Sequence, residues 1–123
     1  MTMRALFMPS ATTSTSDTSG TGAMMQAIWN GAVIAESPRT IRLEGNHYFP
    51  AESVNRAYLI DSEKKSVCVW KGIARYYSLR VGAETNPDAA WYYEHPSFLA
   101  RRIKGYVAFW NGVTVRDTEI QSP

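Results

Sequence analysis

Short apolar segments separated by turn signals at close spacing constrain the fold of this chain more than any other sequence feature. Residues 25–29 and 32–36 flank Asn30-Gly31, and an Asn-Gly pair supplies the positive φ angles that a two-residue type I′ hairpin requires. Residues 40–44 follow as a third strand, with Ile41 and Leu43 on one face. This spacing is typical of a small all-β or β-rich domain.

The same pattern continues to the end of the chain. Residues 106–110 and 113–116 flank Asn111-Gly112, which predicts a second hairpin. Two segments break the β pattern, at residues 50–60 and 96–103; each begins with a proline, which suits the first turn of a helix. The remaining predicted strands are 66–71, 73–81 (joined to 66–71 at Gly72) and 89–93.

We therefore expect a mainly β fold, a small antiparallel β domain with two short helices and a disordered N-terminal leader. Residues 1–22 are rich in Ser and Thr from residue 10 onward and hold few side chains that could offset the entropy of ordering, so they are expected to be flexible. The single domain should cover residues 23–117, with a frayed tail at 118–123. All aromatic side chains except Phe7 follow the leader, and most must be core.

Composition excludes several classes of partner. The net charge of +2 is mild and the basic residues are scattered, with local groups at Lys64-Lys65 and at Arg101-Arg102 with Lys104. Nucleic-acid surfaces need clustered Lys and Arg on one face, so no nucleic-acid partner is expected. No apolar run approaches the roughly 20 residues that span a bilayer, so no membrane partner is expected either.

The chain contains one cysteine, Cys68, which forbids an internal disulfide and a multi-cysteine zinc site. A reducing compartment fits this usage, and the first nine residues make a poor secretory signal, so a cytoplasmic location is expected. Glu44, His47 and His95 could bind a metal only if the fold joined them, and no spacing predicts that. We therefore expect no metal and no cofactor; the oligomeric state is not predicted.

Several spaced motifs occur in an order that resembles one family, the domain of unknown function 427 family, which also carries a nucleotidyltransferase-like label. The resemblance covers residues 24–116 and is carried by Trp29-Asn30-Gly31, Ala35-Glu36-Ser37, Glu-Gly-Asn-His-Tyr-Phe-Pro at 44–50, Cys-Val-Trp-Lys-Gly at 68–72, Tyr76-Tyr77, Ala-Trp-Tyr-Tyr at 90–93 and Gly-Tyr-Val-Ala-Phe at 105–109.

The resemblance implies a compact antiparallel β domain similar to the β-tent type, which also includes methionine sulfoxide reductases and the ligand-binding domain of cereblon. It does not imply nucleotidyl transfer here, because the chain has no Gly-Ser opening to a helix and no Asp-x-Asp pair for catalytic magnesium. The family usually has proline after the cysteine, where this chain has Val69. A loop geometry fixed by a Cys-Pro bond is therefore not carried over.

Three residues are candidate catalytic groups. His47 follows a turn-prone Gly-Asn pair and has a pKa range suited to proton transfer, although a histidine that hydrogen-bonds across a turn explains it equally well. Cys68 could be a nucleophile if Lys71 or His47 activated it, but its strand-like neighbours favour an inert, buried thiol. Lys71 could bind an anion or, if desolvated, act as a nucleophile or base; the alternative is a solvated lysine at a strand end.

The predicted ligand-binding residues combine polar groups with aromatic walls. They are Glu44, Asn46, Tyr48, Trp70, Tyr76 and Trp91. Glu44 could equally form a structural salt bridge, and core packing explains any one of the aromatic residues. His95, beside Pro96 at a predicted helix start, is expected to be a capping or surface residue.

Two functions remain open. The first is a domain with a polar and aromatic pocket for a small polar or anionic molecule, which could be enzymatic. The second is a non-catalytic module whose aromatic side chains receive a protein or peptide. A redox role based on Cys68 is a weaker third, and it would need an external thiol because no second cysteine can resolve a sulfenate.

Overall fold

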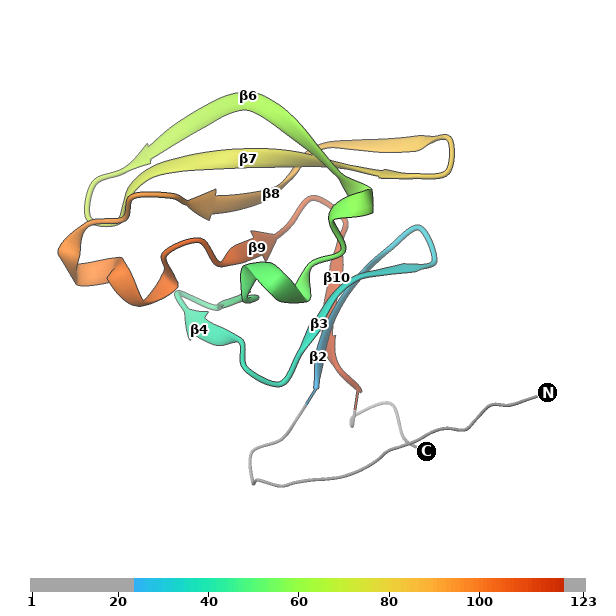
Figure 1. The fold of residues 1–123 in the computed structure, drawn as a ribbon, viewed down its shortest axis with the longest axis horizontal. Helices are drawn as coiled ribbons and strands as arrows, with labels where there is room; N and C mark the ends of the chain where they lie inside the picture. The colour runs from blue at the N-terminus through green and yellow to red at the C-terminus, as the bar shows by residue number, and fades with distance from the viewer. Residues whose placement is uncertain (1–23, 119–123) are drawn as a thin grey trace.

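The computed structural model describes residues 24–118, which form three antiparallel sheets with the strand orders β10-β2-β3, β4-β5 and β6-β7-β8-β9 (Figure 1). The predicted mainly β fold is confirmed. The predicted leader, 1–22, and all of the predicted tail except Thr118 lie outside the described residues. The strands are β2 (Met25–Trp29), β3 (Ala32–Ser37), β4 (Ile41–Leu43), β5 (Asn46–Tyr48), β6 (Leu59–Cys68), β7 (Gly72–Val81), β8 (Glu84–Tyr93), β9 (Val107–Phe109) and β10 (Thr114–Asp117).

The first predicted hairpin is confirmed. Asn30 and Gly31 have φ angles of 52° and 77°, and they join β2 to β3 in an antiparallel pair. Strand β4 lies inside the predicted 40–44 segment. Glu44 is not part of it, because Glu44 and Gly45 form a second left-handed turn, with φ angles of 54° and 82°, that leads into β5.

The second predicted hairpin is wrong. Asn111 and Gly112 do form a left-handed turn, with φ angles of 57° and 94°, but the strands on either side join different sheets. Strand β9 pairs with β8, whereas β10 crosses to pair with β2. The side chain of Asn111 donates to the carbonyl of Pro87 at 3.2 Å, so the turn is bonded to β8. Long-range pairing here overrides a local hairpin signal.

Two strands are longer than predicted. Strand β6 extends back to Leu59 through a charged stretch, which suits its place at the edge of the four-stranded sheet, where charged side chains discourage further pairing. Strand β8 begins at Glu84 rather than Ala89. Pro87 is accommodated because Asp88, with a φ angle of 53°, lies in a bulge opposite β7.

The helical segments are three short 3₁₀ turns, instead of the two helices predicted: η2 (Ala51–Ser53), η3 (Arg56–Tyr58) and η4 (Phe98–Ile103). Val54 divides the first predicted helix because it is extended and forms an isolated bridge with Ala35. Asn55 then starts η3, accepting a 3.0 Å hydrogen bond from the amide of Ala57. The β-bridge of Val54 therefore interrupts the helix predicted for residues 50–60.

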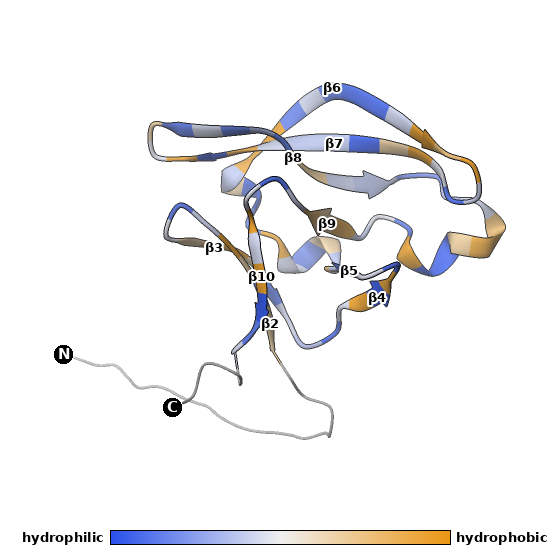
Figure 2. Cartoon of the chain, turned by 180° about the vertical axis from the view of Figure 1, so that it is seen from behind, coloured by the Kyte–Doolittle hydropathy of each residue, from blue (hydrophilic) through white to orange (hydrophobic). Residues whose placement is uncertain are grey.

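Two apolar clusters hold the sheets together. The larger gathers residues of β2 and β3 with Leu79 and Phe109 of the four-stranded sheet. The smaller gathers Tyr48, Tyr93 and Ile103 from β5, β8 and η4. The β4-β5 hairpin continues onto β9, because Phe49 and Val107 exchange backbone hydrogen bonds of 2.7 and 2.8 Å. Figure 2 shows that β9 is hydrophobic, as expected for a strand with both faces covered.

The two ends of the described chain lie together. Strand β10 pairs with β2 over its whole length, and the amide of Thr118 donates to the carbonyl of Met24 at 2.9 Å. The domain therefore closes on itself through this sheet.

Candidate functional site

Lys71 is the buried residue with a charged side chain in the described part of the chain, at 5% exposure. Its ammonium group forms an ion pair with the Oε1 atom of Glu44. The Nζ atom also lies 5.7 Å from the ring centroid of Trp70 and 5.4 Å from that of Tyr93, so two aromatic rings face the cation. The charge is thus held by one carboxylate and two rings.

The backbone around Lys71 is fixed by the segment that precedes η4. The amide of Ser97 donates to the carbonyl of Lys71 at 2.8 Å, and its hydroxyl donates to the carbonyl of Trp70. Gly72 follows with a φ angle of +120°, and a Cβ there would lie 3.3 Å from the carbonyl oxygen of His95. Only glycine combines this backbone angle with so close an approach.

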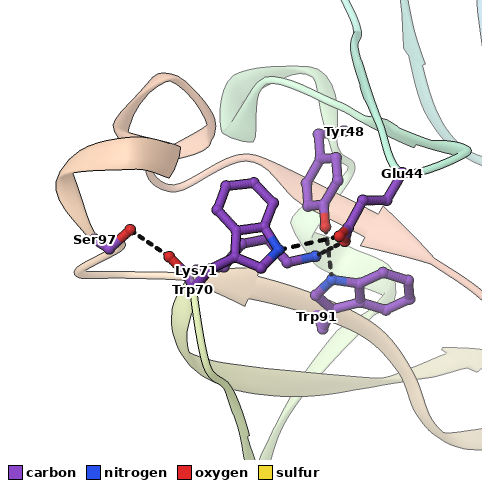
Figure 3. Close-up of polar contacts among 6 residues, drawn as sticks. All are labelled: Glu44, Tyr48, Trp70, Lys71, Trp91 and Ser97. Carbon is purple, nitrogen blue, oxygen red and sulfur yellow. Dashed lines mark hydrogen bonds and ion pairs between the residues drawn. The ribbon is translucent and has the colours of Figure 1, made fainter.

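Glu44 occupies a costly backbone position. Four described residues other than glycine have positive φ angles, and the other three are Asn30, Asp88 and Asn111, whose short side chains tolerate this region. Glutamate has no such advantage. Its carboxylate instead accepts hydrogen bonds from Lys71 and, at 3.1 Å, from the indole of Trp70 (Figure 3). Strained positions of this kind cluster at functional sites.

A cavity of about 170 Å³ opens beside Lys71. Four of its lining residues share one face of the four-stranded sheet, because the cross-strand pairs Ala74 with Tyr93 and Tyr76 with Trp91 both project there. Trp110 completes the wall from the end of β9, and its indole donates to the carbonyl of Asp88 at 2.6 Å. The cavity is lined by Lys71, Ala74, Tyr76, Trp91, Tyr93 and Trp110.

Trp91 is the central wall of this cavity. Its ring meets Trp110 edge to face at a centroid distance of 6.1 Å and meets Tyr48 in the same way at 6.2 Å. Its indole also donates to the hydroxyl of Tyr48 at 3.2 Å (Figure 3). The ring is therefore held on two sides, which makes the wall rigid before any ligand arrives.

The ion pair shifts the pKa of both partners. Burial would lower the pKa of Lys71, but the hydrogen bond to Glu44, with the neighbouring Tyr48 and Tyr93, raises it above its ordinary value. The pKa of Glu44 is lowered by its hydrogen bonds from Lys71 and Trp70. Burial raises the pKa of Tyr93, although the nearby ammonium opposes that effect. At neutral pH the site therefore holds an ammonium and a carboxylate.

The structure brings most of the predicted site residues together. Glu44 and Tyr48, from the motif at residues 44–50, lie beside Trp70 and Lys71, from the motif at residues 68–72. Trp91 bonds to Tyr48, and Tyr76 lines the cavity. Asn46 follows Gly45 in β5 and lies opposite Leu43, with its side chain half-buried.

His47 lies elsewhere. Successive residues of a strand face opposite sides, so His47 projects away from the face of β5 that carries Tyr48. Its Nδ1 atom lies 3.1 Å from the hydroxyl of Thr40. Burial and the neighbouring Arg42 lower the pKa of His47, with Asp117 opposing them. The structure therefore does not bring His47 to Lys71.

Cys68 is half-buried and packs against the smaller cluster near Tyr93, but its side chain is not among those that line the cavity. It precedes the turn that carries Trp70 and Lys71. Its role as a nucleophile stays a prediction.

Three residues that line the cavity, Ala74, Tyr93 and Trp110, were not predicted as site residues. Tyr93 could have been found, because it lies two residues from Trp91 in the predicted 89–93 strand and so shares its face. Trp110 gave no such signal, since its place depends on β9 pairing with β8 rather than with β10. Placing Trp110 at the cavity requires knowing that β9 pairs with β8.

No group of three His, Cys, Asp or Glu side chains within residues 24–118 is arranged to hold a metal ion. No helix in the same range is long and apolar enough to cross a membrane.

No curated protein matches the chain. A family model described as a domain of unknown function (DUF427) matches residues 17–121, a range that includes every strand within residues 24–118 and every side chain of the site. The protein therefore belongs to the DUF427 family.

Proposed function

We propose that the cavity beside Lys71 binds a small organic acid, whose anionic group pairs with the ammonium of Lys71 while its body lies between the aromatic walls. The observation that carries this proposal is a buried ammonium at the edge of an aromatic cavity, paired with a carboxylate whose side chain is 48% exposed. An incoming anion can replace such a partner, because Glu44 can return to water at little cost.

The charge of the site favours an anion over a cation. Aromatic rings around a cavity can form a cage for a cationic ligand, but Trp70 and Tyr93 already face the ammonium of Lys71. A second cation would meet like charge at short range. The rings of Trp91, Tyr93 and Trp110 line the cavity and offer flat apolar contact to a planar acid.

The volume limits the size of the acid. About 170 Å³ is less than the roughly 300–1,000 Å³ of pockets that hold drug-sized ligands. A single-ring carboxylic acid is the class of molecule that fits, with its ring against Trp91 and its carboxylate at Lys71.

The raised pKa of Lys71 supports binding over catalysis. A lysine that acts as a nucleophile or base needs a lowered pKa so that its amine is neutral near pH 7. Lys71 has the opposite shift, because Glu44 stabilises the charged form. We therefore propose an anion-binding role for Lys71 and no covalent step.

Isothermal titration calorimetry with benzoate and its neutral isostere benzamide tests the proposal. Benzoate should bind and benzamide should bind more weakly, because only the carboxylate can pair with Lys71. The variant Lys71→Met should lose benzoate binding, whereas Lys104→Met, which removes an exposed ammonium, and Cys68→Ser should keep it.

Two results would contradict the proposal. Equal affinity for benzoate and benzamide would show that charge plays no part in the cavity. Unchanged benzoate binding by a folded Lys71→Met protein would place the anion elsewhere on the molecule.

A further inference from the structure

The most exposed large apolar side chains of residues 24–118 gather at one end of the molecule. They come from the β6-β7 turn and its flanks and from the start of η4: Val67 at 76%, Val69 at 100%, Ile73 at 55%, Phe98 at 73% and Leu99 at 74% exposure. The other exposed ones, Val33, Ile60 and Trp110, do not exceed 49%. We call these five residues the apolar tip.

The tip is one continuous feature. Val67 and Ile73 are cross-strand partners in β6 and β7, and Val69 lies in the turn between them. The start of η4 is bonded to this turn through the 2.8 Å hydrogen bond from Ser97 to Lys71, and Phe98 and Leu99 follow directly. Figure 2 shows hydrophobic colour at the end of the β6-β7 hairpin and on the neighbouring η4.

Basic residues surround the tip. Lys65 and Arg75 are cross-strand partners next to Val67 and Ile73, and both are exposed. Arg101, Arg102 and Lys104 lie at or just after the end of η4, also exposed, with the Arg101 guanidinium 4.4 Å from the ring centroid of Phe98. Glu94 is an acidic neighbour, and it is paired with Arg75 at 3.1 Å. Lys65, from one basic group of the sequence, and Arg101, Arg102 and Lys104, which form the other, thus flank one apolar end.

We propose that the apolar tip inserts into the surface of an anionic lipid bilayer, with the surrounding Lys and Arg side chains on the headgroups. Apolar side chains that enter the interface gain from leaving water, and each basic residue adds attraction to anionic lipid. Val69 is fully exposed at the end of a hairpin, a position from which a side chain can enter the surface of a bilayer. Because surface binding needs no membrane-spanning segment, the lack of an apolar run does not bear on it.

Vesicle sedimentation of the full chain tests the proposal. The protein should sediment with phosphatidylcholine vesicles that contain about a third phosphatidylserine, less with pure phosphatidylcholine, and less as salt rises above roughly 0.1 M. Val69→Asp should lower the partition coefficient at least about tenfold, because it replaces an inserted apolar side chain by a carboxylate that anionic headgroups repel. Since Val69 is fully exposed, this change leaves the fold intact.

Matched variants separate the tip from general stickiness. Val33→Asp makes the same charge change at an exposed apolar residue of β3 and should bind nearly as well as wild type. Arg102→Gln should weaken binding about fivefold. Lys71→Met should bind vesicles normally, because it removes the anion site and leaves the apolar tip unchanged. A failure of the membrane proposal can therefore be distinguished from a failure of the proposed anion site.

Absence of sedimentation with the anionic vesicles at low salt would overturn the proposal. An equal loss of vesicle binding in Val33→Asp and Val69→Asp would also overturn it, because binding would then depend on net charge and not on the apolar tip. Binding that ignores both the lipid charge and Arg102 would exclude an anionic surface as the partner.

Discussion

Replacing Lys71 by methionine should leave the stability of the domain nearly unchanged, although it removes a buried ion pair. Methionine keeps most of the apolar stem and offers sulfur contacts to Trp70 and Tyr93 in place of the two cation–ring contacts. Glu44 can then be solvated, since half of its side chain is already exposed. Removing one partner of an ion pair is strongly destabilising when the other charge is left buried, and the exposure of Glu44 avoids that cost here.

Lys71→Ala is the matched comparison and should be much more damaging. It removes three buried methylene groups at about 0.8 kcal/mol each, or about 2.4 kcal/mol in total, before the lost ring contacts are counted. For a domain of this size, each kcal/mol corresponds to about 4–8 °C in Tm. We therefore expect Lys71→Ala to lower Tm by roughly 10–20 °C and Lys71→Met to lower it by less than about 5 °C.

Thermal unfolding followed by circular dichroism checks this, and its pH dependence provides a second test. The pKa of Glu44 is lowered from 4.5 and that of Lys71 is raised from 10.5, so the ion pair is fully present between those two values. Wild type should lose stability relative to Lys71→Met as pH falls through the lowered pKa or rises through the raised one. An equal fall in Tm for the methionine and alanine variants would refute the reasoning, because the charge of Lys71 would then itself be needed for the stability of the domain.

Three further predictions follow from single contacts. Glu44→Gln should bind benzoate more tightly than wild type in calorimetry, because Lys71 loses its competing carboxylate; weaker binding would show that Glu44 helps to hold the ligand. Gly72→Ala should lower the urea midpoint more than Gly112→Ala, since both have positive φ angles but only the first Cβ meets a carbonyl, at 3.3 Å. His47 should titrate below pH 6.5 by NMR, and stability should fall as pH drops below that value because its folded pKa is lowered; a midpoint above 6.5 would contradict its burial.

The sequence predicted the parts of the fold that depend on neighbouring residues. Asn30-Gly31 predicts the right hairpin because the two strands that it joins, β2 and β3, pair with each other. Asn111-Gly112 carries the same signal and predicts the wrong hairpin, because β9 pairs with β8 and β10 pairs with β2. Nothing in residues 106–116 encodes that choice, which depends on a strand more than eighty residues earlier in the chain.

The sequence predicted most residues of the site but not their arrangement in space. Glu44 and Lys71 were both candidates, but their pairing depends on the β4-β5 turn folding over the β6-β7 turn. His47 was grouped with them because it is close in sequence. Recognising residues 46–48 as a strand would have placed Tyr48 and His47 on opposite faces.

The closure of the chain at Met24 and Thr118 bears on how the domain can be joined to other sequences. Because its two ends emerge at one point, the domain could be inserted into an exposed loop of a host protein without spreading that loop apart. A circular permutant that links these ends and opens the chain at the exposed Gly82-Ala83 turn should keep both the cavity and the tip. The order of the strands along the chain could therefore be changed while their arrangement in space is kept.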